Sequence, residues 1–202
     1  MGNNKYKDDK SFNNNINSGG NGGNKVIIVN CKIFCFHELT IINVLENDKI
    51  IQRSVSKIKN GDKVLTFDGN HKILTKVLKI EENKGLFEFY EFRCKNQDSM
   101  MKNIMVTGNH TMIIYGKEND EIQFKYASQV KVGDLFRTTD GMFQVYEINK
   151  KMMNESYELR VENGTVLAND ILVSTLYLRK NENVKEYQKI IEKLKIPIEN
   201  LN

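Results

Sequence analysis

The sequence predicts an all-β domain that is built from two related β-units and followed by a short amphipathic helix. Between about residues 25 and 175, short runs of β-branched and aromatic residues alternate with Gly, Asn and Asp turns. This alternation is typical of many short strands. Two segments with the same turn residues recur within this region, and near the C-terminus apolar residues fall at helical spacing. Together these observations favour a pseudo-twofold β fold over a single irregular sheet.

The N-terminal segment, residues 1–24, is rich in Asn, Gly and Lys and holds few apolar residues. Such a segment buries too little apolar surface to offset the entropy of ordering, so we expect a disordered tail. It also lacks the apolar stretch of a signal peptide. No apolar run in the chain reaches the roughly 20 residues of a membrane-spanning helix. We therefore expect a cytoplasmic protein that has no membrane partner.

The charges of the chain are nearly balanced, with 30 Lys and Arg against 26 Asp and Glu and a formal net charge of +4. The basic residues are interleaved with acidic ones and form no basic stripe, so we expect no nucleic-acid partner. The three cysteines do not have the spacing of a disulfide framework, which fits a reducing compartment. We expect a monomer that needs no cofactor.

An internal repeat organises the predicted β-domain, which spans residues 25–178. NGDKVLTFDG at residues 60–69 is matched by VGDLFRTTDG at residues 132–141. The first copy continues to YEFRC at residues 90–94, and the second continues to YELRV at residues 157–161. Neither unit alone offers enough apolar surface for a core, so we expect the two to pack about a pseudo-twofold axis.

The last predicted segment, residues 179–202, contains a C-terminal helix and a tail. Its apolar residues fall at helical spacing among charged ones and are Val184, Tyr187, Ile190, Ile191 and Leu194. Pro197 ends this pattern. We expect the helix to pack on the β-domain.

Cysteine and histidine are the scarce reactive residues of the chain. Cys35 enters a predicted strand and His110 closes one, and the ends of turns are where functional side chains are often presented. Cysteine is a strong nucleophile, and histidine can move a proton near neutral pH. Structural packing is the alternative for any buried cysteine. Cys94 alternates with Phe92 in its predicted strand, so we expect it in the core.

The sequence predicts no metal site. Cys31, Cys35, His37 and His71 are the candidate ligands, and no two of them have the paired spacing that metal sites usually show. His37 and His71 stand beside turn residues, so we expect both to be exposed.

Five motifs follow one another between Cys35 and Leu176. They are Cys35-Phe36 with Thr40, IKNGDKVLTFDGN, VTGNH at residues 106–110, ASQVKVGD, and ENGTVLANDILVST at residues 162–175. In this order they resemble the sequence blocks of the hedgehog/intein (Hint) family of self-processing domains. The last motif is similar to the closing strands of hedgehog C-terminal domains. The resemblance implies a pseudo-twofold, horseshoe-shaped all-β fold.

The resemblance also implies a reaction of the chain on itself. The Cys35 thiolate would attack the carbonyl carbon of Phe34 and convert the Phe34–Cys35 peptide bond into a thioester. His110 would protonate the departing amine, and the Thr107 hydroxyl would hydrogen-bond at the scissile peptide. Water or a small thiol would then release residues 1–34. Each molecule would react once, so this would be autoproteolysis and not enzymatic turnover.

Hedgehog domains use an acidic residue near the end of the strand after the first Gly-Asp turn to activate their acceptor. Glu82, with Glu81 beside it, falls at this place. The resemblance therefore implies Glu82 as an acceptor-activating acid. A solvated pair of carboxylates is the alternative.

The C-terminal end of the match departs from both branches of the family. Inteins end in His-Asn followed by Cys, Ser or Thr, whereas this chain has Ser174, Thr175 and Leu176. Hedgehog domains have a cysteine where Thr175 stands. Without an Asn to cyclise, we expect cleavage without protein splicing. Asn169-Asp170 is predicted to form a hairpin turn.

A second function remains open from the sequence. A catalytically inactive Hint-fold module for interaction or regulation would also lack the terminal Asn, and would need no domain in residues 1–34. The set of Cys35, Thr107 and His110 favours self-processing, because a scaffold has no need of it.

Overall fold

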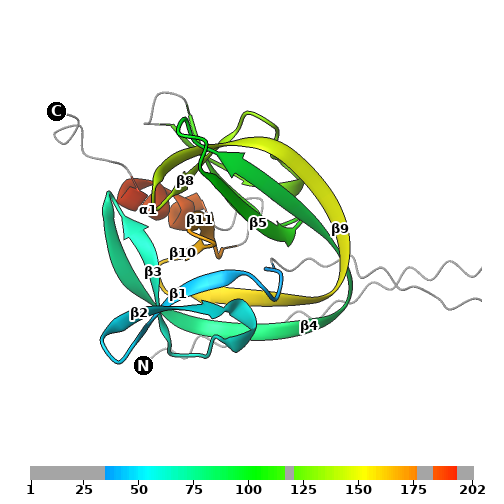
Figure 1. Cartoon of the computed structure of the whole chain (residues 1–202). Helices are drawn as coiled ribbons and strands as arrows, with labels where there is room; N and C mark the ends of the chain where they lie inside the picture. Colours follow the sequence, from blue (N-terminus) through cyan, green and yellow to red (C-terminus); the bar gives the residue numbers. More distant parts are fainter. Residues whose placement is uncertain (1–34, 117–120, 177–183, 195–202) are drawn as a thin grey trace, which may run out of the picture.

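The structure is a computed structural model, and it describes residues 35–116, 121–176 and 184–194. These residues form one antiparallel sheet of eleven strands, one α-helix and two single-turn 3-10 helices (Figure 1). The strands are β1 (Ile41–Glu46), β2 (Lys49–Ser54), β3 (Lys63–Asp68), β4 (His71–Lys95), β5 (Met101–Thr107), β6 (Thr111–Tyr115), β7 (Ile122–Tyr126), β8 (Leu135–Thr138), β9 (Gly141–Val161), β10 (Thr165–Ala168) and β11 (Ile171–Ser174), and the helix is α1 (Val184–Leu194). The all-β class with a C-terminal helix is confirmed. The predicted tail at residues 1–24 and Pro197 lie outside the described residues.

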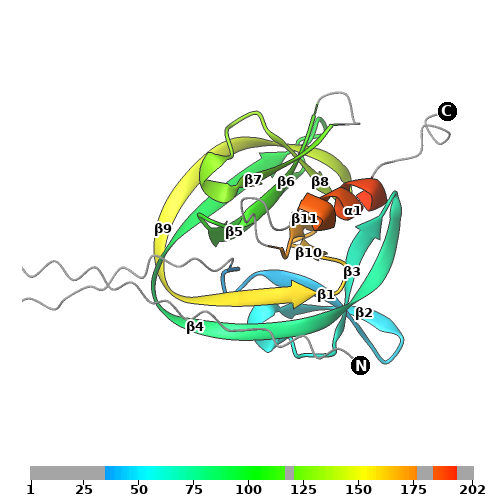
Figure 2. The ribbon, with the colours of Figure 1, turned by 180° about the vertical axis from the view of Figure 1, so that it is seen from behind.

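Two long, curved strands, β4 and β9, run side by side around the molecule (Figures 1 and 2). Their pairing extends from Val77 opposite Val161 to Lys95 opposite Gln144, and three register shifts interrupt it. Such irregularities bend a strand and increase its twist. Each long strand begins in a hairpin of its own unit, β3–β4 or β8–β9, and ends beside the other unit.

The register of β4 and β9 shows the predicted pseudo-twofold symmetry. Val77 pairs with Val161, and their counterparts in the other unit, Val145 and Cys94, also pair with each other. The backbone N–H of Gly61 donates to the carbonyl of Val77 at 2.8 Å. In the second unit, Gly133 donates to Val145 at the same distance.

The repeated Gly-Asp pair forms the same turn in both units. Gly61 and Gly133 have φ angles of +91° and +98°, which glycine adopts without steric cost. The carboxylate of Asp62 accepts a hydrogen bond from the backbone N–H of Lys59, and Asp134 accepts one from that of Lys131, both at 2.9 Å. The motif therefore recurs because each copy closes the loop that enters the β-hairpin.

The main core fills the space between the two units. It contains aromatic and aliphatic side chains from both, including Phe36, Phe92, Phe136 and Phe143. Cys94 is fully buried in this core, as expected, and burial raises the pKa of its thiol to about 12. The single large core fits the expectation that neither unit buries enough surface alone.

Helix α1 packs on a second apolar cluster at the outer face of β3, β10 and β11 (Figure 2). Ile190 and Leu194 are buried there, and the ring of Tyr187 lies 4.5 Å from that of Phe124. The predicted docking of the helix is confirmed. Among the described residues, no helix has the length and apolarity needed to cross a membrane.

The β10–β11 hairpin has its turn at Asn169-Asp170, with φ angles of +48° and +63°. Two successive residues with positive φ are characteristic of a type I′ turn, which suits the twist of a two-residue hairpin. The prediction for this dipeptide is confirmed.

Candidate active site

The segment that carries Cys35 is inserted between β5 and β9. The backbone of Phe36 exchanges two hydrogen bonds of 2.9 Å with Tyr157 on β9 and forms a bridge with Val106 on β5. This insertion buries Cys35 and Phe36 completely. The cysteine is therefore held by strands that come from both β-units.

Thr107, the last residue of β5, contacts both backbone groups of Cys35. The backbone N–H of Cys35 donates to the Thr107 Oγ1 atom at 3.0 Å, and the Thr107 N–H donates to the Cys35 carbonyl at 3.0 Å. The nitrogen of Cys35 is the amide nitrogen of the Phe34–Cys35 peptide bond. The Thr107 hydroxyl thus lies at the predicted scissile peptide, while Phe34 itself is outside the described residues.

His110 is placed by a tight turn that follows β5. Its backbone N–H donates to the carbonyl of Thr107 at 2.8 Å, and its ring lies 4.6 Å from that of Phe36. The side chain is fully buried. Burial lowers the pKa of His110 to about 3, against the opposing effect of a hydrogen bond with the backbone of Ser174. The imidazole is therefore neutral at pH 7.

Asn83 on β4 contacts the sulfur of Cys35, a contact that sequence reasoning did not predict. Its Nδ2 atom donates to the Cys35 Sγ atom at 3.8 Å, a distance that fits a weak hydrogen bond to sulfur. Glu82 precedes it and is exposed, with an ion pair to Lys84 at 3.3 Å. Because successive residues of a strand point to opposite faces, Glu82 and Asn83 cannot both face the thiol. Strand alternation could have separated the two residues, but only the fold shows which one faces Cys35.

The end of β11 closes the site on the side of His110. Ser174 and Thr175 are buried. The backbone N–H of Thr175 donates to the carbonyl of Gly164 at 2.8 Å, and the N–H of Leu176 donates to the Ser174 Oγ atom at 3.0 Å. Ser174 and Thr175, which the motif resemblance aligns with the C-terminal end of the family, thus take part in local hydrogen bonds.

The expectation that His37 is exposed is wrong: its exposed fraction is 8%. Its Nδ1 atom accepts a hydrogen bond from the backbone N–H of Leu39 at 3.2 Å, and its ring packs edge-on against Phe89. Burial lowers the pKa of His37, opposed by the negative charge of Glu38 and assisted by the positive charge of Lys151. The turn at residues 37–40 directs the His37 side chain into the protein, and the local sequence does not indicate this direction. His71 is exposed, as predicted.

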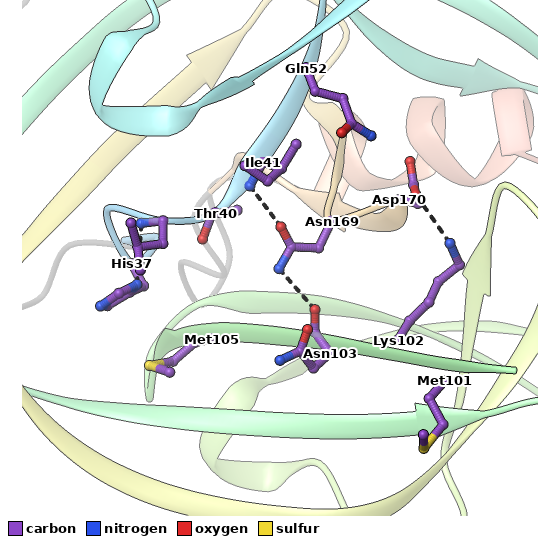
Figure 3. Close-up of a pocket in the computed structure, with 11 residues that line it drawn as sticks. His37, Thr40, Ile41, Gln52, Met101, Lys102, Asn103, Met105, Asn169 and Asp170 are labelled. Carbon is purple, nitrogen blue, oxygen red and sulfur yellow. Dashed lines mark hydrogen bonds and ion pairs between the residues drawn. The ribbon is translucent and has the colours of Figure 1, made fainter.

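A pocket of about 530 Å³ opens beside this segment, between the turn after Cys35, strand β5 and the Asn169-Asp170 turn (Figure 3). His37 and Met105 line one end of it. The side-chain amide of Asn169 crosses the pocket, accepting from the N–H of Ile41 at 2.7 Å and donating to the carbonyl of Asn103 at 2.9 Å. No signal in the sequence marked this pocket, because its walls are far apart along the chain.

The described part of the chain contains no cluster of potential metal ligands. No three or more His, Cys, Asp or Glu side chains lie close enough together there to hold an ion. Cys31, one of the four candidate ligands, is outside the described residues.

Comparison with solved structures finds inteins over most of the chain. A variant of the gp41-1 intein has a TM-score of 0.54 at 19% identity and covers 70% of this chain and 98% of its own. An intein from a hyperthermophile has a TM-score of 0.59 at 14% identity and covers 70% and 99%. A bacterial intein-like domain from Clostridium thermocellum has a TM-score of 0.55 at 19% identity and covers 69% and 97%. No protein-family model and no curated protein sequence matches.

The chain therefore has the Hint fold of inteins. This fold brings Cys35, Thr107 and His110 to one place, at the junction of the two β-units. Asn83 joins them, whereas Glu82 lies on the other face of β4.

Proposed function

We propose that this chain cleaves its own Phe34–Cys35 peptide bond by an N-to-S acyl shift, followed by hydrolysis or thiolysis and without protein splicing. The observation that carries the proposal is the hydrogen bond between the N–H of Cys35 and the hydroxyl of Thr107. It puts a polar group at the nitrogen that must leave, in a site that is closed to solvent. Cys94, by contrast, is buried within the paired strands β4, β5 and β9.

The acyl shift moves one bond and one proton. The Cys35 sulfur forms a bond to the carbonyl carbon of Phe34, and the bond from that carbon to the Cys35 nitrogen breaks. The thiol proton must end on this nitrogen, which becomes an amine. A neutral imidazole can accept the thiol proton and then pass it on; the low pKa of His110 disfavours the first transfer but makes the protonated ring a strong acid toward the departing nitrogen.

Positioning must supply much of the rate, because an amide is more stable than a thioester. The insertion of residues 35–37 between β5 and β9 fixes the backbone of the nucleophile. Thr107 holds the same residue through its hydroxyl and its backbone N–H. Such pre-organisation lowers the entropic cost of reaching the transition state.

The second step would hydrolyse or thiolyse the thioester and free the N-terminal flank. Asn83 faces the sulfur and cannot act as a base, since an amide does not accept a proton near neutral pH. The acceptor is therefore expected to be water or a thiol. A thiol can ionise without an activating carboxylate. With Ser174 and Thr175 at the other end, no Asn is present there to cyclise, and the reaction stops at cleavage.

The test is intact-mass spectrometry of the purified chain with and without dithiothreitol. We expect loss of residues 1–34, faster with the thiol, from the unaltered protein and from Cys31→Ala. Cys35→Ala should keep its full mass under both conditions. Cys31→Ala is the matched control, since it removes a thiol from the flank while sparing the nucleophile.

A full-length mass in every sample would overturn the proposal. It would favour a catalytically inactive Hint-fold module for interaction or regulation. One observation supports that second candidate: the intein positions for C-terminal chemistry hold Ser174 and Thr175 in local hydrogen bonds.

A further inference from the structure

We propose that the pocket beside Cys35 binds the second nucleophile of the reaction, and that this nucleophile is a small thiol with no other charged group. The inference rests on the proposed function, because it names the acceptor of the same thioester. Four features of the described residues carry it: the position of the pocket, its origin in the pseudo-symmetry, its charge and its size.

The pocket lies one step along the sheet from Cys35. Cys35 faces Thr107 across the sheet, and the next pair on the same face is His37 with Met105, linked by the N–H of His37 and the carbonyl of Met105 at 3.3 Å. His37 and Met105 line the pocket. Residues two apart in a strand are separated by roughly 7 Å. A bound molecule in this pocket is therefore within reach of a thioester on Cys35.

The pocket is the pseudo-twofold counterpart of the reaction site. The turn from Thr107 to His110 is closed by an N–H to carbonyl bond of 2.8 Å, and the turn from His37 to Thr40 by an equivalent bond of 2.9 Å. The next bond along is also repeated: Ala127 donates to the carbonyl of His110 at 2.7 Å, and Val55 donates to that of Thr40 at 2.7 Å. The repeat thus places two equivalent turns about the Phe36–Val106 bridge. One carries Thr107 and His110 of the proposed reaction site, and the other borders the open pocket.

The charged groups of the pocket neutralise each other. The ammonium of Lys102 lies 3.1 Å from the carboxylate of Asp170 (Figure 3). It also lies 2.8 Å from the carboxylate of Asp140, which is outside the lining. The remaining surface mixes amides with the apolar side chains of Leu39 and Met101. A ligand with a net charge would meet no unpaired counter-ion among these lining residues, so an uncharged molecule fits better.

The volume of the pocket, about 530 Å³, is within the usual range for small-molecule sites. A thiol bound there would attack the thioester carbonyl. A bond forms from its sulfur to the acyl carbon, the bond from that carbon to the Cys35 sulfur breaks, and the thiol proton ends on Cys35. No oxidant or further reactant is needed.

The test compares cleavage rates across concentrations of four thiols. Dithiothreitol and 2-mercaptoethanol are uncharged, whereas mercaptoethanesulfonate is anionic and cysteamine is cationic. We expect the rate to saturate with the two uncharged thiols and to rise linearly with the two charged ones, after correction for the thiolate fraction of each.

A pocket-filling variant gives the second arm. Met101→Trp should raise the half-saturating concentration of dithiothreitol about tenfold, while the rate of hydrolysis without thiol stays unchanged. Met100→Trp is the matched control, since Met100 is also exposed but does not line the pocket. The unchanged hydrolysis rate shows that a variant is folded and competent.

Two results would overturn the inference, and they are distinguishable. Linear rates for all four thiols, with Met101→Trp equal to the unaltered chain, would mean attack from bulk solvent; the pocket would lose its role while the cleavage stands. No cleavage with any thiol or in water would remove the proposed function and the acceptor site together.

Discussion

Asn83 places an amide N–H, and no charge, against the sulfur of Cys35. A hydrogen bond to sulfur favours the thiolate, while a neighbouring carboxylate would disfavour it. The residue thus places a neutral hydrogen-bond donor at the proposed nucleophile. Nothing in its own stretch of sequence, between Glu82 and Lys84, distinguishes it from other polar residues of a solvated strand.

Replacing Asn83 by Asp should move the pH profile of cleavage. The added negative charge raises the pKa of the Cys35 thiol, so the midpoint of the rate–pH curve should rise by about one pH unit. Cleavage at high pH should recover, which a merely structural defect would not allow. Lys84→Gln, at an exposed neighbouring position, should keep the midpoint. A midpoint that is the same in Asn83→Asp would show that the contact does not influence ionisation.

His110 gives a prediction on stability, because burial lowers its pKa from 6.5 to about 3. The folded state disfavours the proton, so this contribution to stability is complete above pH 6.5 and is lost as the pH falls from 6.5 towards 3. Between pH 7 and pH 4.5 the unaltered chain should lose about 2 kcal/mol more than His110→Gln. Urea unfolding at the two pH values measures the difference. Equal losses in both proteins would contradict a neutral, buried histidine.

At the scale of elements, the sequence predicts well what local chemistry determines. The Gly-Asp turns can be predicted because each needs a residue with a positive φ followed by a carboxylate that accepts a backbone hydrogen bond. Helix α1 can be predicted because its buried residues Tyr187, Ile190 and Leu194 recur at helical spacing.

Elements that depend on pairing with strands far along the chain could not be predicted in the same way. The segment at residues 35–37 is ordered by β5 and β9, which follow far along the chain. That pairing buries His37, brings Asn83 to the thiol and shapes the pocket. The candidate residues Cys35, Thr107 and His110 came from a resemblance in motif order, and only the assembled sheet shows that they meet.

The whole molecule is two repeats that exchange their long strands. β4 begins in the hairpin with β3 and ends against β5 and the first part of β9, while β9 ends against the first part of β4. The proposed reaction site lies where this exchange brings the halves together, since Cys35 precedes the strands of the first repeat and Thr107 and His110 lie at the matching place before β6 and β7. A site assembled in this way can exist only when both halves are folded.

The exchange predicts that the domain unfolds as one unit. Phe136 on β8 is fully buried. Its ring lies edge-on to the ring of Phe92, with 5.7 Å between the ring centres. Phe92 lies on β4 and belongs to the first repeat. Phe136→Ala should cost about 3 to 5 kcal/mol through the cavity that it leaves. Hydrogen exchange should then speed up for the amides of β3 as much as for those of β8, because β3 has no stable fold without the shared core. Faster exchange limited to β8 and its neighbours would instead mean that the two repeats unfold independently.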